Sequence, residues 1–406
     1  MTVITESRIT SVVRAAEALL SHRAGSPVVL AEPEDLGGSG RTTVVRTRVA
    51  QNPLSMDRTL VIKALPDHED PRAFHREIVS YKYATALPAE SRPGPQLIAS
   101  DPDARLMVLS DLGRGSTMTT LLSGNDVVEI SRALSAWGQA LGRMHAATVG
   151  GEGDFAALVR RGPSGTEGRD VLRDEALRAV SSASARSAEL GVQMSAEVSA
   201  ALNAACRRFD EGEHRAFSPS DVGPENIMLN DEGVQFMDYE WGGFRDASLD
   251  IAYALVTFPA LLMPSALARH LELETAMVDA WRSEVHSIWP SLRRDRDLAH
   301  SITIARLLWV WLSTVWMLPD DDRLGAGALD EAGLASAALA GDQNIAEFDA
   351  APMPARYTHD WALHSNDPRV IVARWSDLAT AAASVDEEIS RFAAEMGIAL
   401  HRTWLA

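Results

Sequence analysis

Three oxygen-bearing side chains are spaced along one short stretch of the sequence in a way that suits phosphoryl transfer. Asp221 and Asn226 lie five residues apart in a loop-like segment, and Asp238 follows twelve residues after the asparagine. Transfer of a phosphoryl group from ATP needs a carboxylate that accepts the acceptor's hydroxyl proton and oxygen ligands that hold magnesium. We therefore predict that Asp221 is the general base and that Asn226 and Asp238 hold Mg²⁺. The alternative for this segment alone is a solvent-exposed turn rich in Asn and Asp.

The N-terminal part of the chain supplies a cation and a carboxylate for the same chemistry. Lys63 lies inside a predicted strand and Glu77 lies on the helix predicted after it. A kinase needs a lysine on the nucleotide phosphates and a carboxylate that orients the lysine. The chain has only two lysines, so a lysine here is informative, although edge-strand lysines and solvated helix carboxylates are individually common. Three upstream glycines would let backbone amides approach the phosphates: Gly37, Gly38 and Gly40.

Together these motifs resemble those of the aminoglycoside phosphotransferase and choline kinase superfamily, which shares the protein-kinase-like fold. The family's His-Gly-Asp-x-x-x-x-Asn motif is matched at Asp221 and Asn226, and its Ile-Asp-Trp-Glu motif by Met237-Asp238-Tyr239-Glu240. The resemblance covers residues 36–255 and implies Mg²⁺-dependent transfer of the ATP γ-phosphate to a hydroxyl group.

The resemblance also suggests roles for residues outside these two motifs. The run 106–113 resembles the hinge between two lobes, so the backbone near Ser110 and Asp111 would meet the nucleotide base. Asp250 matches the second aspartate of the family's Asp-Pro-x-x-Asp-Leu-Ala run, where it would support the loop structurally. His145 matches a family position at a helix end, where we expect it to pack.

One residue departs from the family pattern. Pro219 stands where the family has a histidine, two residues before the catalytic aspartate. That histidine braces the loop and does not accept the proton, so its replacement bears on loop geometry and leaves the base itself in place. A degenerate pseudokinase that serves as a binding module therefore stays an alternative, as does an unrelated helical protein.

Hydrophobic periodicity predicts a small strand-rich N-terminal part and a large helical remainder. Helices are predicted at 6–21, 71–87, 127–147 and 171–209, with more from 249 to the end, and strands at 42–49, 60–65, 105–109, 227–229 and 234–237. The Gly- and Ser-rich segment 150–168 is predicted to be a loop, 302–318 a buried helix, and 319–354 a mobile connection.

The predicted fold class is α+β, in a bilobal protein-kinase-like arrangement that the resemblance implies. A small antiparallel-sheet lobe, residues 1–110, would bind the nucleotide. A large helical lobe, residues 111–406, would carry the catalytic loop at 216–246 and the acceptor-binding helices.

Composition limits the class of partner. The chain has 406 residues, 46% of them hydrophobic, with a net charge of −18, which disfavours nucleic acid and anionic membranes as partners. A single cysteine, Cys206, precludes an internal disulfide and a Cys-based metal cluster. We expect a reducing, cytoplasmic location, and no signal peptide is read at the N-terminus.

The predicted activity is that of an ATP- and Mg²⁺-dependent O-phosphotransferase acting on a small molecule, such as an aminoglycoside, another antibiotic, a sugar or an amino alcohol. GTP stays open as the nucleotide, and the negative net charge favours a cationic acceptor. A kinase that phosphorylates Ser or Thr of a peptide in natural-product biosynthesis stays an alternative.

Overall fold

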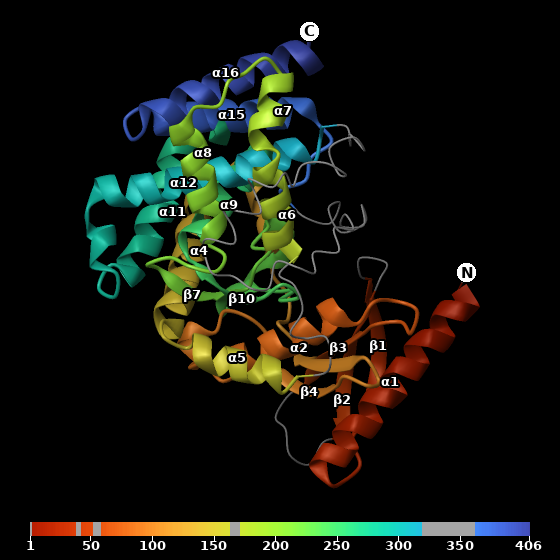
Figure 1. Cartoon of the computed structure of the whole chain (residues 1–406). Helices are drawn as coiled ribbons and strands as arrows, with labels where there is room; N and C mark the ends of the chain where they lie inside the picture. The colour runs from red at the N-terminus through yellow and green to blue at the C-terminus, as the bar shows by residue number, and fades with distance from the viewer. Residues whose placement is uncertain (1, 38–41, 52–57, 163–170, 319–361) are drawn as a thin grey trace. The chain divides into compact units, whose positions relative to one another are not determined.

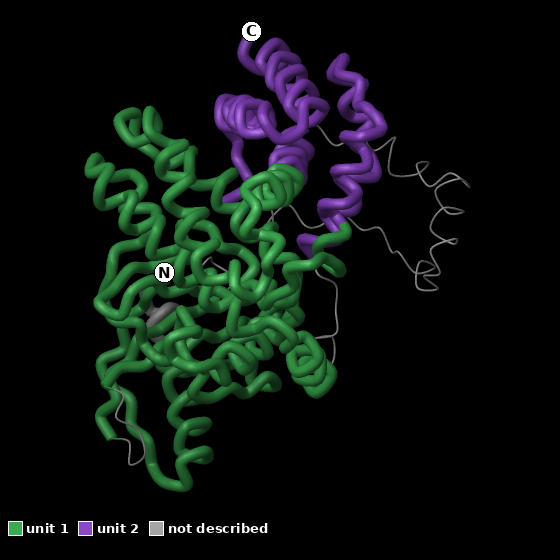
Figure 2. The backbone as a smooth tube through the Cα atoms, turned by 90° about the vertical axis from the view of Figure 1, so that its left-hand side faces the viewer, with its two compact units in different colours: residues 1–170, 207–305 green, residues 171–206, 306–406 purple. Residues whose placement is uncertain are grey.

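The computed structural model describes residues 2–37, 42–51, 58–162, 171–318 and 362–406 (Figure 1). The chain divides into two compact units, drawn in different colours in Figure 2. Unit 1 comprises Met1–Asp170 and Arg207–Ala305, and unit 2 comprises Val171–Cys206 and Arg306–Ala406. The predicted lobe boundary at residue 110 lies inside unit 1, so the division into lobes stays a prediction. All candidate residues for phosphoryl transfer belong to unit 1.

Unit 1 begins with a helix and a five-stranded antiparallel sheet of order β1-β2-β3-β5-β4. These elements are α1 (Thr2–Ala24), β1 (Val29–Gly37), β2 (Thr43–Gln51), β3 (Thr59–Ala64), β4 (Leu97–Asp101) and β5 (Leu106–Ser110). Side chains alternate between the two faces of a strand. Leu60 and Ile62 of β3 are therefore buried in one core with Ala16 of α1, and Lys63 lies on the opposite face.

The helix α2 (Arg72–Thr85) follows β3 and carries Glu77 on its buried side. The predicted helices at 6–21, 71–87 and 127–147 are confirmed by α1, α2 and α4 (Val127–Thr148), and the predicted strand at 60–65 by β3. Strand β4, which the sequence analysis did not predict, completes the sheet.

The rest of unit 1 is mostly helical, with short strands among the helices. The strands are β6 (Ser116–Thr117), β7 (Arg215–Ser218), β8 (Ile227–Asn230), β9 (Gly233–Phe236) and β10 (Gly243–Asp246), and the remaining helices are α3 (Met118–Leu122), α5 (Glu152–Arg160), α9 (Ser248–Thr257), α10 (Pro264–Leu267) and α11 (His270–Val285). β8 and β9 form the predicted hairpin, and β10 pairs with β7. An antiparallel sheet followed by a mostly helical remainder confirms the predicted α+β class.

The helices α4 and α11 approach each other closely because glycines on α4 leave room. A Cβ atom placed on Gly138 would lie 2.3 Å from the carbonyl oxygen of Met277, and one on Gly142 would lie 2.9 Å from that of Trp281. These distances are too short for any side chain, so both positions need glycine.

The prediction of a loop at 150–168 was wrong, because α5 lies within that segment. The single aromatic residue of α5, Phe155, packs against Tyr83, Phe217 and Phe244. Acidic residues in the first turn favour a helix at this position. The buried aromatic contact and the favourable first turn outweigh the Gly- and Ser-rich composition, from which the loop was inferred.

Unit 2 is helical. It contains α6 (Val171–Ser181), α7 (Ala183–Glu189), α8 (Ala196–Arg207), α15 (Pro368–Ala382) and α16 (Glu387–Trp404). The helical pattern predicted at 171–209 is confirmed by α6, α7 and α8. Gly191, which adopts a φ of 78°, ends α7. The connection predicted at 319–354 lies outside the described residues.

The helix α12 (Asp295–Val315) contains most of the predicted buried helix at 302–318. Among the described residues it is the one helix long and apolar enough to cross a membrane. Yet 83% of its most apolar window is buried inside the protein, as expected of a core helix.

Candidate active site

Lys63, Glu77 and Asp238 meet at one point of unit 1. The Nζ atom of Lys63 donates to Oε1 of Glu77 at 2.8 Å and to Oδ1 of Asp238 at 2.7 Å. The lysine side chain is 13% exposed and that of Glu77 is 2% exposed, whereas that of Asp238 is 41% exposed. Two predicted nucleotide residues and a predicted metal ligand are thus in direct contact, although 175 residues separate Lys63 from Asp238. Part of the Asp238 carboxylate remains accessible to an ion.

The charges around Lys63 keep it protonated. Burial alone would lower the pKa of its ammonium group, but the carboxylates of Asp238, Glu77 and Glu240 outweigh burial and hold that pKa above its ordinary value. Burial raises the pKa of Glu77 to about 8, against the opposing effect of Lys63. Carboxylates outnumber cations here, so a divalent cation would have to accompany a nucleotide triphosphate into the site.

The segment that carries Asp238 is fastened to α2 by contacts that sequence reasoning missed. The backbone N–H of Asp238 donates to the hydroxyl oxygen of Tyr81 at 3.1 Å, and the rings of Tyr81 and Tyr239 stack with centroids 4.7 Å apart. Asp238 has a φ of 59°, a left-handed conformation that is uncommon for a residue with a Cβ. Nearby, Nε of Arg76 donates to the carbonyl oxygen of Gly242 at 2.8 Å. These contacts hold the helix that carries Glu77 against the strand end that carries Asp238.

Asp221 is held at both carboxylate oxygens. The hydroxyl group of Tyr253 donates to Oδ1 at 2.7 Å, and Nδ2 of Asn226 donates to Oδ2 at 3.2 Å. Burial, followed by the negative charge of Glu225, raises the pKa of Asp221. A partly buried carboxylate with a raised pKa and a fixed orientation has the properties of a general base once it is ionised.

The β8–β9 hairpin places Asn226 beside Asp238. Ile227 pairs with Phe236 across the hairpin, and the N–H of Met237 donates to the backbone carbonyl of Asn226 at 2.8 Å. Because the amide nitrogen of Asn226 faces Asp221, its amide oxygen is directed elsewhere.

A magnesium ion takes hard oxygen ligands and retains part of its coordination for phosphates and water. The donor set of one amide oxygen and one carboxylate fits that preference. No group of three or more His, Cys, Asp or Glu in the described ranges could hold a metal ion by itself, so Asn226 and Asp238 would bind Mg²⁺ together with phosphate oxygens.

The other residues predicted to bind the nucleotide are the glycines at 37, 38 and 40 and the segment around Ser110. Gly37 has a φ of 80° and its N–H donates to the Asp35 carboxylate at 2.9 Å, whereas Gly38 and Gly40 lie outside the described residues. The N–H of Ser110 donates to the carbonyl oxygen of Gln96 at 2.9 Å. A contact to the nucleotide base would therefore have to come from another backbone group of this segment.

The side chain of Asp111 is engaged in an ion pair. Nε and Nη2 of Arg46 donate to its two carboxylate oxygens at 2.8 and 3.1 Å. Burial acts to raise the pKa of Asp111, but the hydrogen bond from Arg46 keeps that pKa below its ordinary value. The ion pair ties β2 to the segment that follows β5.

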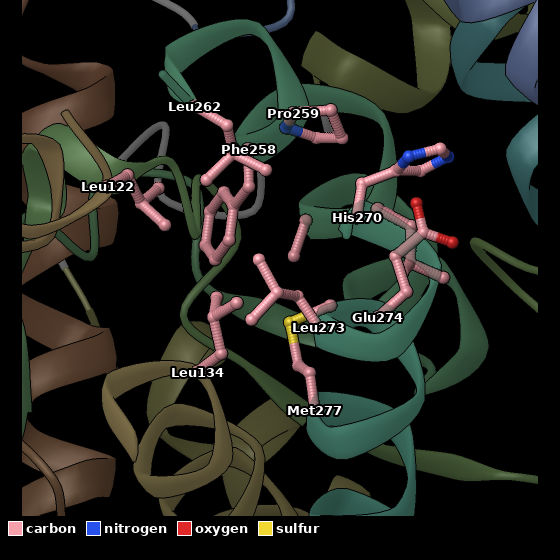
Figure 3. Close-up of a pocket in the computed structure, with 11 residues that line it drawn as sticks. Leu122, Leu134, Phe258, Pro259, Leu262, His270, Leu273, Glu274 and Met277 are labelled. Atoms are coloured by element: carbon pink, nitrogen blue, oxygen red, sulfur yellow. The ribbon is translucent and has the colours of Figure 1, made fainter. Parts of the chain in front are cut away.

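A separate pocket is lined by residues of α3, α4, α9 and α11 (Figure 3). Its lining is mainly apolar, with Phe258, Leu273 and Met277 among its residues and with His270 and Glu274 on one side. Neither Lys63 nor Asp221 lines this pocket, so it is distinct from the candidate phosphoryl-transfer site.

Comparison with known proteins returned solved structures alone, since no family model and no curated protein matches the chain. A choline/ethanolamine kinase family protein from Mesorhizobium loti is similar at 16% identity and a TM-score of 0.44, over 95% of this chain and 99% of that chain. An aminoglycoside phosphotransferase in a ternary complex with ADP and hygromycin B is similar at 16% identity and a TM-score of 0.40, over 74% of this chain and 92% of that chain.

A third similar structure is an amicoumacin kinase in complex with AMP-PNP and Ca²⁺, at 12% identity and a TM-score of 0.41, over 76% of this chain and 86% of that chain. At these identities and TM-scores the likeness assigns neither a reaction nor a substrate, so both have to be argued from the residues of this chain.

Proposed function

We propose that the protein is an ATP- and Mg²⁺-dependent O-phosphotransferase that moves the γ-phosphate to a hydroxyl group of a small molecule. One observation carries the proposal: Lys63 contacts both Glu77 and Asp238, and Asn226 bonds to Asp221 and lies beside Asp238 across the hairpin. Phosphoryl transfer depends mainly on positioning and charge neutralisation. The four polar groups and the lysine supply both.

The roles follow from the chemistry of each side chain. Asp221 would accept the proton of the acceptor hydroxyl through its carboxylate, while the Tyr253 hydrogen bond keeps that carboxylate in place. Lys63, oriented by Glu77, would bind the nucleotide phosphates. Asn226 and Asp238 would hold Mg²⁺, which neutralises charge that develops on the phosphate oxygens.

A cationic acceptor fits the electrostatics. The chain carries a net charge of −18. The pKa of Asp221 is raised by burial and then by the negative charge of Glu225, which is exposed. A positively charged amine near Asp221 would offset that charge and favour the ionised base. We therefore propose a hydroxylated amine as the acceptor class. A cytoplasmic location stays a prediction.

Transfer of ³²P from γ-labelled ATP to a panel of hydroxylated amines tests the proposal. The panel contains choline, ethanolamine and aminoglycosides, with neutral sugars and Ser/Thr peptides as separate arms. Wild-type protein should label at least one hydroxylated amine, and Asp221→Ala should label none. Labelling confined to the peptide arm would favour the peptide kinase, and equal labelling by Asp221→Ala would show that Asp221 is not the base.

A pseudokinase predicts a different result in the same assay. It would transfer no phosphate to any arm, at any magnesium concentration, while remaining folded. Absence of transfer together with absence of nucleotide binding would contradict the proposed function.

A further inference from the structure

The residue immediately before Asp221 has an unfavourable backbone conformation. Ser220 adopts a φ of 81°, in the left-handed region where a Cβ atom is disfavoured. Ser220 is 2% exposed, and it is preceded by Pro219, which has no N–H group to donate. Neighbouring groups must therefore hold this conformation.

Four side chains form a buried cluster around this loop, which we call the Arg245–Asp250 brace: Ser218, Ser220, Arg245 and Asp250. Nη2 of Arg245 donates to the backbone carbonyl oxygen of Ser220 at 2.7 Å, and Nε donates to Oδ1 of Asp250 at 2.8 Å. Oγ of Ser218 donates to the same Oδ1 at 2.8 Å and accepts the N–H of Ser220 at 2.9 Å. Ser220 is thus held at both its N–H and its carbonyl oxygen.

Asp250, the carboxylate of the brace, is held in place by His145 and Trp281. Nε1 of Trp281 donates to Nδ1 of His145 at 3.0 Å, so Nε2 of His145 is the nitrogen that carries the proton toward Oδ2 of Asp250, also at 3.0 Å. Burial acts to raise the pKa of Asp250, but Arg245 and His145 keep that pKa below its ordinary value. The carboxylate is therefore ionised and its two oxygens are both engaged.

Burial of the brace argues for a role in conformation more than in stability. Arg245 is 3% exposed and Asp250 is 0% exposed. The desolvation cost of a buried ion pair offsets much of its Coulomb energy, so such pairs add little net stability. What Arg245 does supply is a planar fork that reaches two acceptors, Ser220 and Asp250, in one geometry.

The helix α9 contacts the loop on both sides of Ser220. Asp250 in its first turn anchors Ser218 and Arg245, and Tyr253, three residues later, donates to Asp221. The backbone before Asp221 and the carboxylate of Asp221 are consequently set by the same rigid element.

We propose that Arg245 is a positioning residue, which keeps Ser220 left-handed and thereby aims the Asp221 carboxylate at the acceptor. The proposal rests on the proposed function, since aiming matters only if Asp221 is the base. In the family that the sequence resembles, a histidine at position 219 braces this loop. Pro219 has no side-chain donor, and we assign the bracing role to Arg245.

The first test replaces Arg245 by methionine, which keeps the length of the side chain and removes its donors. We expect kcat to fall about 100-fold, the size typical of a misplaced catalytic group, while KM for ATP changes less than about twofold because Lys63 and Asp238 are untouched. Amide hydrogen exchange of residues 215–226 should rise about tenfold or more. Arg282→Met is the matched control, because Arg282 also donates to backbone carbonyls of unit 1, at Leu292 and Arg293. The control should leave both kcat and the amide hydrogen exchange of residues 215–226 unchanged.

The second test is a rescue that a merely structural role would not produce. Glycine adopts positive φ without the Cβ penalty, so Ser220→Gly placed in the Arg245→Met background should recover about tenfold in kcat. Ser220→Val, whose branched side chain resists positive φ, should show no recovery. If Arg245→Met does not fold, Arg245→Lys, which keeps the charge without the fork, takes its place with the same expectations.

The outcomes separate the two proposals. Unchanged exchange at 215–226 and unchanged kcat in Arg245→Met would overturn the positioning role, as would equal loss of kcat with and without Ser220→Gly. If wild-type protein transfers no phosphate, the proposed function fails. The exchange measurement then decides the brace by itself, with faster exchange at 215–226 supporting it and unchanged exchange refuting it.

Discussion

At the scale of single residues, the site depends on one ammonium group and the carboxylates around it. Lys63 is one of two lysines in the chain, and the other, Lys82, is exposed at the end of α2. Lys63 is partly buried and bonded to two carboxylates, whereas Lys82 is exposed on α2, so the two lysines offer a matched pair for mutation.

Lys63→Met should remove the cation that the nucleotide phosphates need. We expect kcat/KM for ATP to fall about 100-fold or more, because a charged interaction with the nucleotide phosphates is lost. Removal of the ammonium also leaves Glu77 and Asp238 without the cation that they share. The free energy of unfolding should therefore fall by on the order of 3 kcal/mol. Steady-state kinetics and urea unfolding measure both effects. Lys82→Met serves as the control, and an equal loss of activity in Lys82→Met would contradict a specific role of Lys63.

Tyr253→Phe removes one hydroxyl and keeps the ring. Because that hydroxyl donates to Oδ1 of Asp221, kcat should fall about tenfold while the free energy of unfolding falls by about 1 kcal/mol. Single-turnover phosphate transfer and thermal unfolding provide the two numbers. A variant with wild-type kcat would show that the Asp221 carboxylate needs no fixing from α9.

At the scale of elements, much of what positions the site could be predicted from local pattern. The apolar run at 227–229 and the Asn230–Gly233 turn indicate the hairpin, and the apolar run at 60–65 indicates β3. The partners of the site residues could not be predicted in this way. Tyr81 bonds to a backbone 157 residues away and Arg245 to one 25 residues away, and neither contact leaves a period or motif in the sequence.

The close packing of α4 on α11 gives an element-scale prediction. Gly138→Ala would place a Cβ atom 2.3 Å from the Met277 carbonyl, so one helix must shift. Overpacking of this kind should lower the free energy of unfolding by about 2 kcal/mol. Gly153→Ala is the control, since a Cβ atom there meets nothing within 4 Å. Equal unfolding midpoints in urea for the two variants would refute the close approach.

The turn from β10 to α9 gives a prediction about pH. Burial acts to raise the pKa of Asp246, but hydrogen bonding by His214 and the charge of Arg208 hold it well below its ordinary value. A group whose pKa is lowered by folding stabilises the native state above its unfolded pKa, here about 3.9, and loses that contribution as the pH falls. Asp246→Asn should therefore be less stable than wild type by about 3 kcal/mol at pH 7, with a gap that narrows below about pH 4. Urea unfolding across this range measures the gap, and a gap independent of pH would be inconsistent with the lowered pKa.

At the scale of the whole molecule, residues remote in the sequence are gathered within unit 1. Unit 1 contains both the N-terminal sheet with Lys63 and the hairpin with Asn226 and Asp238, although residues 171–206 between them belong to unit 2. Carboxylates outnumber cations around Lys63. A triphosphate bound there would therefore need a divalent ion to offset the negative charge.

Calorimetric titration of ATP into the protein, with and without Mg²⁺, tests the central claim most directly. We predict that Mg²⁺ strengthens ATP binding to wild-type protein by about tenfold or more, and that Asp238→Ala abolishes this effect of the metal. ATP binding that is indifferent to Mg²⁺, or equally Mg²⁺-dependent in Asp238→Ala, would contradict the assignment of Asp238 and the account of the site built on it.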